Sequence, residues 1–350
     1  AAIDGARDYI HLETYIWRED HFGRLFAQHL RRKARAGVRV RVIVDGFGSE
    51  LSWGFLEELK DDKVEVLEYR PLALISDWRS VERLSRRNHR KILIVDGRRS
   101  FCGGLNIGDE YAYSTAGSEA WRDTHLEIRG PVTAQLESLF RETWHSQGGR
   151  PYRRYPEVSR DSVADQAVLA LALPSDEAGQ RGTIRRHYLH AIDHAKHSID
   201  IANAYFVPNR QFVAALEAAA SRGVRVRLLL PSLRHNDVPV VQLASQHLYR
   251  RLLRSGVRIF QWPISHMHAK TAVVDGVWAT VGSYNLDAIS LFQNLEVVIE
   301  VVSESFGTSM TAMFEADFDR SVELDLTTWK QRGLLQQLSE PLLYRARRFL

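Results

Sequence analysis

The chain has 350 residues, of which 45% are hydrophobic, enough for one large or two ordinary domains with apolar cores. No stretch approaches the roughly 18 uninterrupted apolar residues of a membrane-spanning helix, which excludes a transmembrane segment within this sequence. The single cysteine, Cys102, excludes an internal disulfide and a cysteine-rich metal site, and the net charge of +4 is only mildly basic.

The first half of the chain alternates strand and helix patterns. Apolar or alternating stretches predict strands at residues 10–17, 37–42, 64–69 and 89–97. A helical stretch precedes the second of these strands. A further strand that carries Gly and Asn and a last strand near residue 123 complete the half.

The second half repeats this order, with matching strands at residues 199–207, 223–228, 257–262 and 268–276. Helices that alternate with strands predict an α/β fold. We expect two α-β-α sandwich domains related by a pseudo-twofold axis, each a mixed, mostly parallel sheet flanked by helices.

Residues 146–165 are rich in Gly, Pro, Arg and Ser and predict a linker between a first domain at 1–145 and a second at 166–350. The second domain opens with an apolar strand at 167–173 that has no counterpart in the first. We therefore expect that the chain lacks its true N-terminus, and with it any signal or anchor there.

The first half also carries an insertion before its final strands. The spacing there is 14 residues longer than in the second half, and the extra residues fall within 71–88. This segment combines arginines with apolar side chains, including Leu74, Ile75 and Trp78. Two interpretations stay open: a lid or membrane-facing lip, or an amphipathic helix packed on its own domain.

Two copies of one motif carry most of the functional information. Residues 89–97 (HRKILIVDG) and 268–276 (HAKTAVVDG) both read H-x-K-x4-D-G, and in both an asparagine follows the histidine by 17 positions. The candidate residues are therefore His89, Lys91, Asp96 and Asn106 in the first half and His268, Lys270, Asp275 and Asn285 in the second. The chain has 40 Arg and only 7 Lys, so two lysines at equivalent places are unlikely by chance.

The spacing predicts a phosphodiester site. His and Lys two positions apart in a strand lie on one face, and two such strands would bring two imidazoles and two ammonium groups together. One imidazole attacks phosphorus, and the other protonates the leaving oxygen and later deprotonates the incoming hydroxyl. Both lysines, with Asn106, Asn285 and Ser283 as phosphate- or substrate-binding residues, stabilise the developing charge, so no metal ion is required.

The final strand of each half offers a carboxylate to orient a histidine: Asp123 in the first half and Glu296 in the second, 34 and 28 residues after the respective histidines. Asp96 and Asp275 belong to the catalytic motif, but we expect them to hold a turn rather than to touch substrate. Nearby residues without a counterpart in the other half are expected to be structural or at the surface; these are Arg90, His125 and His266.

On these motifs the chain resembles the phospholipase D superfamily, whose hallmark is a paired H-x-K-x4-D motif. More narrowly it resembles bacterial cardiolipin synthases, over the stretches NHRKILIVDGRRSFCGGLNIGDEY, WRDTHLEIRGP, IANAYFVPN, HAKTAVVDGVWATVGSYNLD and SLFQNLEV. The stretch IRRHYLHAIDHAKHSIDIANAYFVP is most similar to B-type synthases, which lack N-terminal transmembrane helices. The likeness runs from Ile10 to about Leu350.

The resemblance implies two phospholipase D-like domains and phosphatidyl transfer without a metal or other cofactor. One phosphatidylglycerol would give its phosphatidyl group to His89 and release glycerol, with His268 as acid and base, and a second phosphatidylglycerol would accept the group to form cardiolipin. The partners would be phosphatidylglycerol and an anionic membrane surface, with peripheral attachment on the cytoplasmic side of a bacterial membrane and no nucleic acid. Two alternatives stay open, namely hydrolysis of phospholipid headgroups and a metal-independent nuclease or phosphodiesterase.

Overall fold

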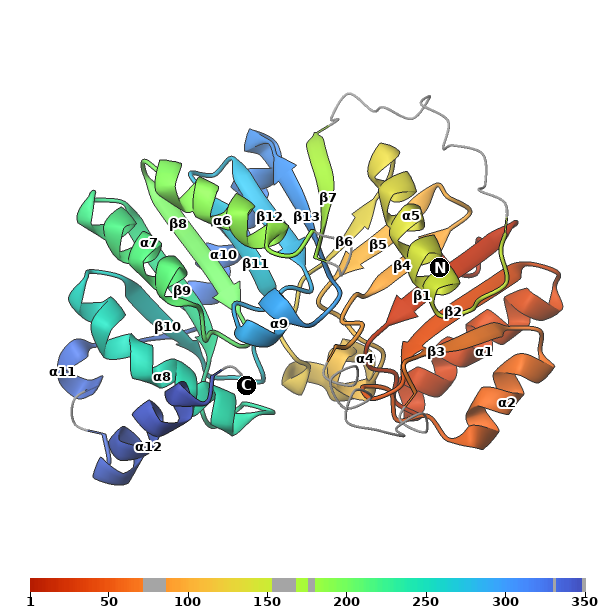
Figure 1. Cartoon of the computed structure of the whole chain (residues 1–350), viewed down its shortest axis with the longest axis horizontal. Coiled ribbons are helices and arrows are strands. Elements are labelled where there is room, and N and C mark those ends of the chain that lie inside the picture. Colours follow the sequence, from red (N-terminus) through yellow and green to blue (C-terminus); the bar gives the residue numbers. More distant parts are fainter. Residues whose placement is uncertain (72–85, 153–167, 176–179, 330–331, 348–350) are drawn as a thin grey trace. The chain divides into compact units, whose positions relative to one another are not determined.

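The computed structural model describes residues 1–71, 86–152, 168–175, 180–329 and 332–347. They form two compact units, each with its own sheet (Figure 1). Unit 1 comprises 1–120, 125–167 and 294–297, and unit 2 comprises 121–124, 168–293 and 298–350. Most of the predicted insertion and linker lies outside the described residues, as do Leu74, Ile75 and Trp78, so those interpretations stay predictions.

Unit 1 is built on a six-stranded sheet with the order β3-β2-β1-β4-β5-β6. Its elements are β1 (Tyr9–Thr14), α1 (His21–Arg35), β2 (Arg39–Asp45), α2 (Trp53–Asp61), β3 (Glu65–Tyr69), β4 (Ile92–Val95), β5 (Arg99–Gly103), α4 (Tyr113–Ala116), β6 (His125–Ile128) and α5 (Pro131–Ser146). Helices α1, α2 and α5 pack on this sheet. The central strands β1 and β2 are therefore buried almost throughout.

Unit 2 is built on an eight-stranded sheet with the order β14-β10-β9-β8-β11-β12-β13-β7. Its elements are β7 (Leu169–Ser175), α6 (Thr183–His194), β8 (Ser198–Asn203), α7 (Arg210–Ser221), β9 (Arg225–Pro231), α8 (Pro239–Arg254), β10 (Arg258–Trp262), β11 (Lys270–Val274), β12 (Trp278–Gly282), α9 (Ala288–Phe292), β13 (Glu296–Val302), α10 (Glu304–Asp319), β14 (Val322–Glu323), α11 (Leu326–Trp329) and α12 (Leu334–Arg345). In Figure 1, α6 and α7 lie in front of this sheet and α10 lies behind it. No helix among the described residues is long and apolar enough to cross a bilayer.

Several helices begin where the sequence places a side-chain cap. The side chain of Asp20 accepts a hydrogen bond from the N–H of Gly23 at the start of α1, and Ser52 does the same for α2. Asn209 caps α7 and Ser303 caps α10 in the same way. Each cap satisfies one of the N–H groups that a helix start leaves without a partner, which fixes where the helix begins.

The predicted internal repeat is confirmed by the strand order. Unit 1 runs β3-β2-β1-β4-β5-β6, and the six central strands of unit 2 run β10-β9-β8-β11-β12-β13. The two extra strands of unit 2, β14 and β7, add to the two edges of this common arrangement. Both motif strands, β4 and β11, pair with the first strand of their repeat.

The sheets are mixed, as expected, but they are not mostly parallel. β1–β2 and β2–β3 pair in parallel in unit 1, and β8–β9 and β9–β10 do so in unit 2. From the motif strand onward the paired strands are antiparallel. The connections differ: β4 joins β5 by a tight hairpin, which gives antiparallel pairing, whereas β1, β2 and β3 are linked by crossovers through α1 and α2, which allow parallel pairing.

Asp96 and Asp275 hold turns, as the sequence predicted. Asp96 and Gly97 have φ values of 53° and 62°, and Asp275 and Gly276 have 53° and 66°. Positive φ at two successive positions is the sign pattern of a type I′ hairpin turn. The Asp96 carboxylate accepts hydrogen bonds from three backbone N–H groups at the start of β1, each at 2.8 Å.

Asp275 makes the equivalent contacts in unit 2, where its carboxylate accepts from the N–H groups of Lys196, His197 and Ser198 at 2.8–2.9 Å. Burial raises the pKa of Asp275, but these three hydrogen bonds outweigh it and hold the pKa below its usual value. Each motif aspartate thus ties its hairpin to the start of the first strand of its repeat.

We expect Asp275→Ala to lower the free energy of unfolding by about 1–3 kcal/mol, because three N–H groups lose their acceptor. Asp275→Asn keeps one acceptor oxygen and tolerates positive φ, so it should cost less. Since the pKa is lowered in the folded state, the contribution is present at neutral pH and is lost as the pH falls through that lowered value. Denaturation at neutral and acidic pH tests this, and an alanine variant that unfolds like the parent at neutral pH would contradict it.

Candidate functional site

Both motif histidines lie just before a strand rather than inside it. β4 starts at Ile92, three residues after His89, and β11 starts at Lys270, two residues after His268. Both histidines and both motif lysines are buried. They therefore belong to packed segments at the strand starts and not to exposed loops.

In unit 1 His89 is held by Glu296. The Nδ1 of His89 lies 3.0 Å from both carboxylate oxygens of Glu296. The backbone N–H of His89 donates to the carbonyl of Leu295 at 3.0 Å, and the N–H of Leu295 donates to the carbonyl of Arg87 at 2.9 Å. The ring and the backbone of His89 are thus fixed by the same short segment, residues 294–297.

In unit 2 His268 is held by Asp123 in the same manner. The Nδ1 of His268 lies 2.6 Å from Oδ2 of Asp123. The backbone N–H of His268 donates to the carbonyl of Arg122 at 2.8 Å, and the N–H of Arg122 donates to the carbonyl of His266 at 2.9 Å. Residues 121–124 therefore play the part here that residues 294–297 play in unit 1.

The expectation that each carboxylate orients the histidine of its own half is wrong. Asp123 lies two residues before His125, which pairs with Gly103, and Glu296 lies two residues before Val298, which pairs with Gly282. Asp123 and Glu296 are thus equivalent in the repeat, but each belongs to the unit of the other motif. The short segments at the start of the last strands, 121–124 and 294–297, have been exchanged, and adjacency along the chain does not reveal this.

The two motif lysines make the same contact in both units. The Nζ of Lys91 donates to the carbonyl of His89 at 2.7 Å, and the Nζ of Lys270 donates to the carbonyl of His268 at 2.5 Å. Each ammonium group is thus anchored next to its histidine. A buried positive charge beside an imidazole is suited to stabilising an anionic oxygen in the same place.

The predicted phosphate-binding residues are all buried but differ in their hydrogen bonds. Asn106 uses its Oδ1 to accept from the N–H of Ile16 and its Nδ2 to donate to the hydroxyl of Tyr111. The Oδ1 of Asn285 has no hydrogen-bond partner among the described residues. Ser283, the residue that follows β12, is fully buried. Asn106 therefore has a structural task that Asn285 does not share.

Two aromatic rings beside the histidines were not predicted. The ring of Tyr15 meets that of His89 edge-on, with centroids 4.9 Å apart. The Nζ of Lys91 lies 5.1 Å from the centroid of the Tyr15 ring. Burial, with the negative charge of Asp45, raises the pKa of Tyr15 to about 12. In unit 2 the ring of Trp121 lies 5.4 Å from that of His268. Tyr15 lies within the predicted strand 10–17 and Trp121 lies near the last predicted strand of its half, but nothing in their spacing marks them as neighbours of the motifs.

A buried polar network supports His89, and the described residues of unit 2 contain no equivalent of it. The Nδ2 of Asn88 donates to Glu13 at 2.6 Å, and its backbone N–H donates to Asp45 at 2.9 Å. The strand registers place Met267 and Ala202 at the positions equivalent to Asn88 and Glu13. The two histidines therefore sit in chemically different surroundings although their carboxylate contacts match.

Two of the three residues expected to be structural, Arg90 and His266, contact backbone carbonyl groups. Buried Arg90 donates through Nε to the carbonyl of Glu296 at 3.3 Å. Burial and the charge of Lys91 lower the pKa of His125 to about 4, so its ring is neutral at ordinary pH. His266 contacts the carbonyl of His235 at 3.2 Å. In the part of the chain that the structure describes, no group of three or more His, Cys, Asp or Glu side chains is arranged to hold a metal ion.

Comparison with known protein families identifies the family of this chain. The family model described as "Cardiolipin synthase, PLD-like domain" matches residues 1–144 and 188–320. Together these stretches make up most of the chain and contain both motifs. The chain belongs to this family.

Named relatives agree with that membership. The chain is 34% identical over 349 residues to cardiolipin synthase 1 of Bacillus cereus, covering 97% of this chain and 67% of the relative. It is 35% identical over 339 residues to cardiolipin synthase A of Pseudomonas entomophila, covering 97% and 69%. These names do not include the B-type, so a nearer likeness to that branch stays a prediction.

Solved structures agree on the fold. A crystal structure of phosphatidylserine synthase from Haemophilus influenzae Rd KW20 is similar with a TM-score of 0.68 at 13% identity, covering 99% of this chain and 89% of that one. Polyphosphate kinase from Porphyromonas gingivalis gives 0.61 at 11% identity, covering 99% and 50%. At such identities the likeness shows the fold alone, and it confirms the predicted α/β class.

Proposed function

We propose that the protein is a phospholipase D-type phosphatidyltransferase that makes cardiolipin from two molecules of phosphatidylglycerol and releases glycerol. The observation that carries the proposal is the pairing of both motif histidines with buried carboxylates in a chain of the cardiolipin synthase family. A histidine whose Nδ1 is held by a carboxylate presents Nε2 for chemistry in a fixed tautomer.

In this proposal the reaction runs in two steps, and both motifs act in each. Nε2 of His89 attacks the phosphorus of phosphatidylglycerol, and the P–N bond forms as the P–O bond to glycerol breaks, with a proton passing from Nε2 of His268 to the leaving oxygen. The headgroup hydroxyl of a second phosphatidylglycerol then attacks phosphorus. His268 takes the proton of that hydroxyl, and the P–N bond breaks to give cardiolipin.

The surroundings of the two histidines support this division of roles. Both imidazoles contact a carboxylate through Nδ1, so each keeps Nε2 for chemistry. The polar network through Asn88 holds the backbone beside His89, as a nucleophile that must meet phosphorus in line requires.

Several residues bind the phosphate in this proposal. Lys91 and Lys270, each anchored beside its histidine, stabilise the non-bridging oxygens as negative charge develops. Ser283 and Asn285 follow β12, the strand that pairs with the motif strand β11. The Oδ1 of Asn285 suits a hydroxyl donor such as the headgroup glycerol. Asn106 acts mainly by holding the backbone at Ile16.

Chelation is expected to leave turnover largely unchanged, because the two lysines supply the positive charge that a metal ion would bring. The measurement is the rate of cardiolipin formation in detergent micelles with and without EDTA. Micelles remove the bridging of lipid headgroups by divalent cations. Complete loss of activity in EDTA, with recovery on addition of a divalent cation, would contradict the proposal.

We also propose that the enzyme works as a peripheral protein on the cytoplasmic face of a bacterial membrane, because phosphatidylglycerol resides in a bilayer. The sequence points to two contact segments that combine arginines with apolar residues, namely 71–88 and 342–350. Arginines near an anionic leaflet contribute about 1 kcal/mol each to binding.

The test of the proposed function is product analysis. Pure protein is incubated with phosphatidylglycerol alone, and the lipids and free glycerol are quantified. Cardiolipin and glycerol in equal amounts support the proposal. Phosphatidic acid as the sole lipid product would make the protein a hydrolase, and cleavage of single-stranded DNA without lipid turnover would make it a nuclease.

A further inference from the structure

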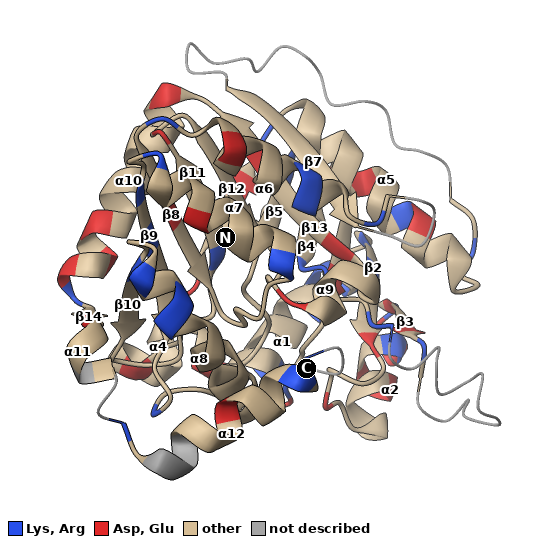
Figure 2. Cartoon of the chain, turned by 60° about the vertical axis from the view of Figure 1, so that its left-hand side comes forward, with Lys and Arg blue, Asp and Glu red and all other residues tan. Residues whose placement is uncertain are grey.

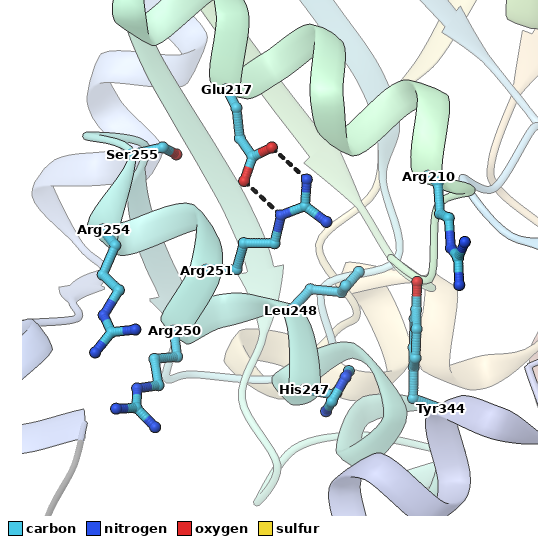
Figure 3. A pocket seen from close by; sticks show the side chains of 9 residues that line it. All are labelled: Arg210, Glu217, His247, Leu248, Arg250, Arg251, Arg254, Ser255 and Tyr344. Atoms are coloured by element: carbon cyan, nitrogen blue, oxygen red, sulfur yellow. Dashed lines mark hydrogen bonds and ion pairs between the residues drawn. The ribbon is translucent and has the colours of Figure 1, made fainter.

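Unit 2 contains a pocket whose lining residues belong to neither motif. It lies between α7, α8 and α12, has a volume of about 780 Å³ and is open to solvent (Figure 3). Its charged lining comes from Arg210 and Glu217 on α7 and from Arg250, Arg251 and Arg254 on α8, with Tyr344 of α12 on one side. This size is ordinary for a small-molecule site.

The arginines of α8 lie on one face of the helix because of their spacing in the sequence. Arg250, Arg251 and Arg254, with His247, recur at intervals of three and four residues, which places them side by side on a helix. The opposite face supplies Ser245, Tyr249 and Leu252, all of them buried. The basic face of α8 is therefore the solvent side of an amphipathic helix.

The charges in the pocket do not cancel. Arg251 forms a two-pronged ion pair with Glu217, with contacts of 2.6 and 2.5 Å (Figure 3). Among the described residues no carboxylate pairs with Arg210, Arg250 or Arg254, so the four guanidinium groups exceed the one carboxylate by three charges. Acidic and basic positions are interspersed on helices of both units (Figure 2).

The pocket suits a phosphate group. A guanidinium group is planar and binds two phosphate oxygens at once, and it stays charged at any physiological pH. Tyr344 stacks on His247 with ring centroids 4.7 Å apart, which closes one side of the pocket without adding negative charge. Burial and the positive charge of nearby Arg347 lower the pKa of His247.

The helix that supplies Tyr344 also carries exposed apolar residues. On α12, Leu338 and Leu342 are 71% and 66% exposed and stand one turn apart on the same face. Exposed Arg345 follows three residues after Leu342. Leucines flanked by arginines are typical of helices that lie in the headgroup region of a membrane.

We infer that this pocket is a second phosphate-binding site, which holds the headgroup phosphate of an anionic phospholipid while Leu338 and Leu342 enter the acyl boundary. The inference rests on the proposed function only for the presence of an anionic lipid surface. The site binds the membrane and takes no part in phosphatidyl transfer. The lipid bound in it is not chemically changed.

The test compares Arg250→Gln/Arg254→Gln with a matched control, Arg7→Gln/Arg98→Gln. The control removes the same charge at two exposed positions outside the pocket. Binding is measured by flotation with vesicles of phosphatidylcholine alone and with phosphatidylglycerol added. We expect the pocket variant to lose about thirtyfold in binding to phosphatidylglycerol vesicles, and the control to lose much less. Equal losses in the two variants, or none in the pocket variant, would overturn the inference.

Two further arms separate the possible sources of phosphate and of failure. Leu338→Ser/Leu342→Ser should weaken vesicle binding as well, whereas inorganic phosphate should raise the melting temperature of the parent only slightly. A large phosphate-induced shift that requires Arg250 and Arg254, combined with unchanged vesicle binding, would assign the site to a soluble phosphate compound and overturn the lipid assignment. Turnover of micellar phosphatidylglycerol should be the same in all these variants, and its absence in the parent would contradict the proposed function and not this site.

Discussion

Replacing either His89 or His268 by alanine should lower the rate of cardiolipin formation by about three orders of magnitude or more, because residues that act as one unit fail together when either is removed. Both histidines have the same carboxylate contact and an adjacent anchored lysine. Neither half should therefore sustain turnover alone. Rates with phosphatidylglycerol in micelles give the comparison.

Matched controls exist for this experiment in each unit. His187 contacts Glu300 at 3.0 Å and His29 contacts Asp4 at 2.6 Å, both histidine–carboxylate pairs outside the motifs. His187→Ala and His29→Ala should keep nearly full activity, and melting temperatures will show whether the motif variants stay folded. If His89→Ala and His268→Ala each kept about half of the parent rate, the two motifs would act independently and the requirement for both in one reaction would be ruled out.

Glu296→Gln and Asp123→Asn should each reduce turnover by about two to four orders of magnitude, since an amide cannot fix the imidazole in the required tautomer. The exchange of segments makes a sharper prediction about which histidine each variant disturbs. The imidazole ¹⁵N signals of His89 should shift in Glu296→Gln, and those of His268 should shift in Asp123→Asn.

Glu300→Gln is the matched control, because it removes a carboxylate from His187 and leaves both motifs intact. A double variant, His89→Ala/Glu296→Gln, should be no slower than His89→Ala alone, since the carboxylate acts through that ring. Signals that move in the opposite pattern, His89 with Asp123→Asn and His268 with Glu296→Gln, would show that each carboxylate serves its own half after all.

The sequence predicted the features that depend on local pattern. Apolar alternation and the recurrence of matching segments located the strands of both repeats, and the order of pairing follows from that repeat. The Asp-Gly steps predicted the hairpin turns because only a few residues accept positive φ at two successive positions. These inferences needed no knowledge of which segments meet in space.

The features that the sequence did not predict depend on long-range contacts. Asp123 and Glu296 were predicted as histidine partners from their place in the final strand of each half, but the exchange between units depends on where two four-residue segments, 121–124 and 294–297, pack. The direction of the later strands was missed because a hairpin and a crossover were not distinguished. Tyr15 and Trp121 had no periodic signal, since each sits beside its histidine only through the folded backbone.

The proposed reaction passes through a covalent intermediate in which the phosphatidyl group is bound to His89. Pure enzyme turning over ³²P-labelled phosphatidylglycerol is quenched with base, digested, and its peptides are examined for a phosphatidyl group bound through a P–N bond. We predict one labelled site per chain, at His89, absent in His89→Ala and lost on addition of an acceptor alcohol in excess. Steady formation of cardiolipin without a label on His89, or with the label on His268, would contradict the mechanism proposed here.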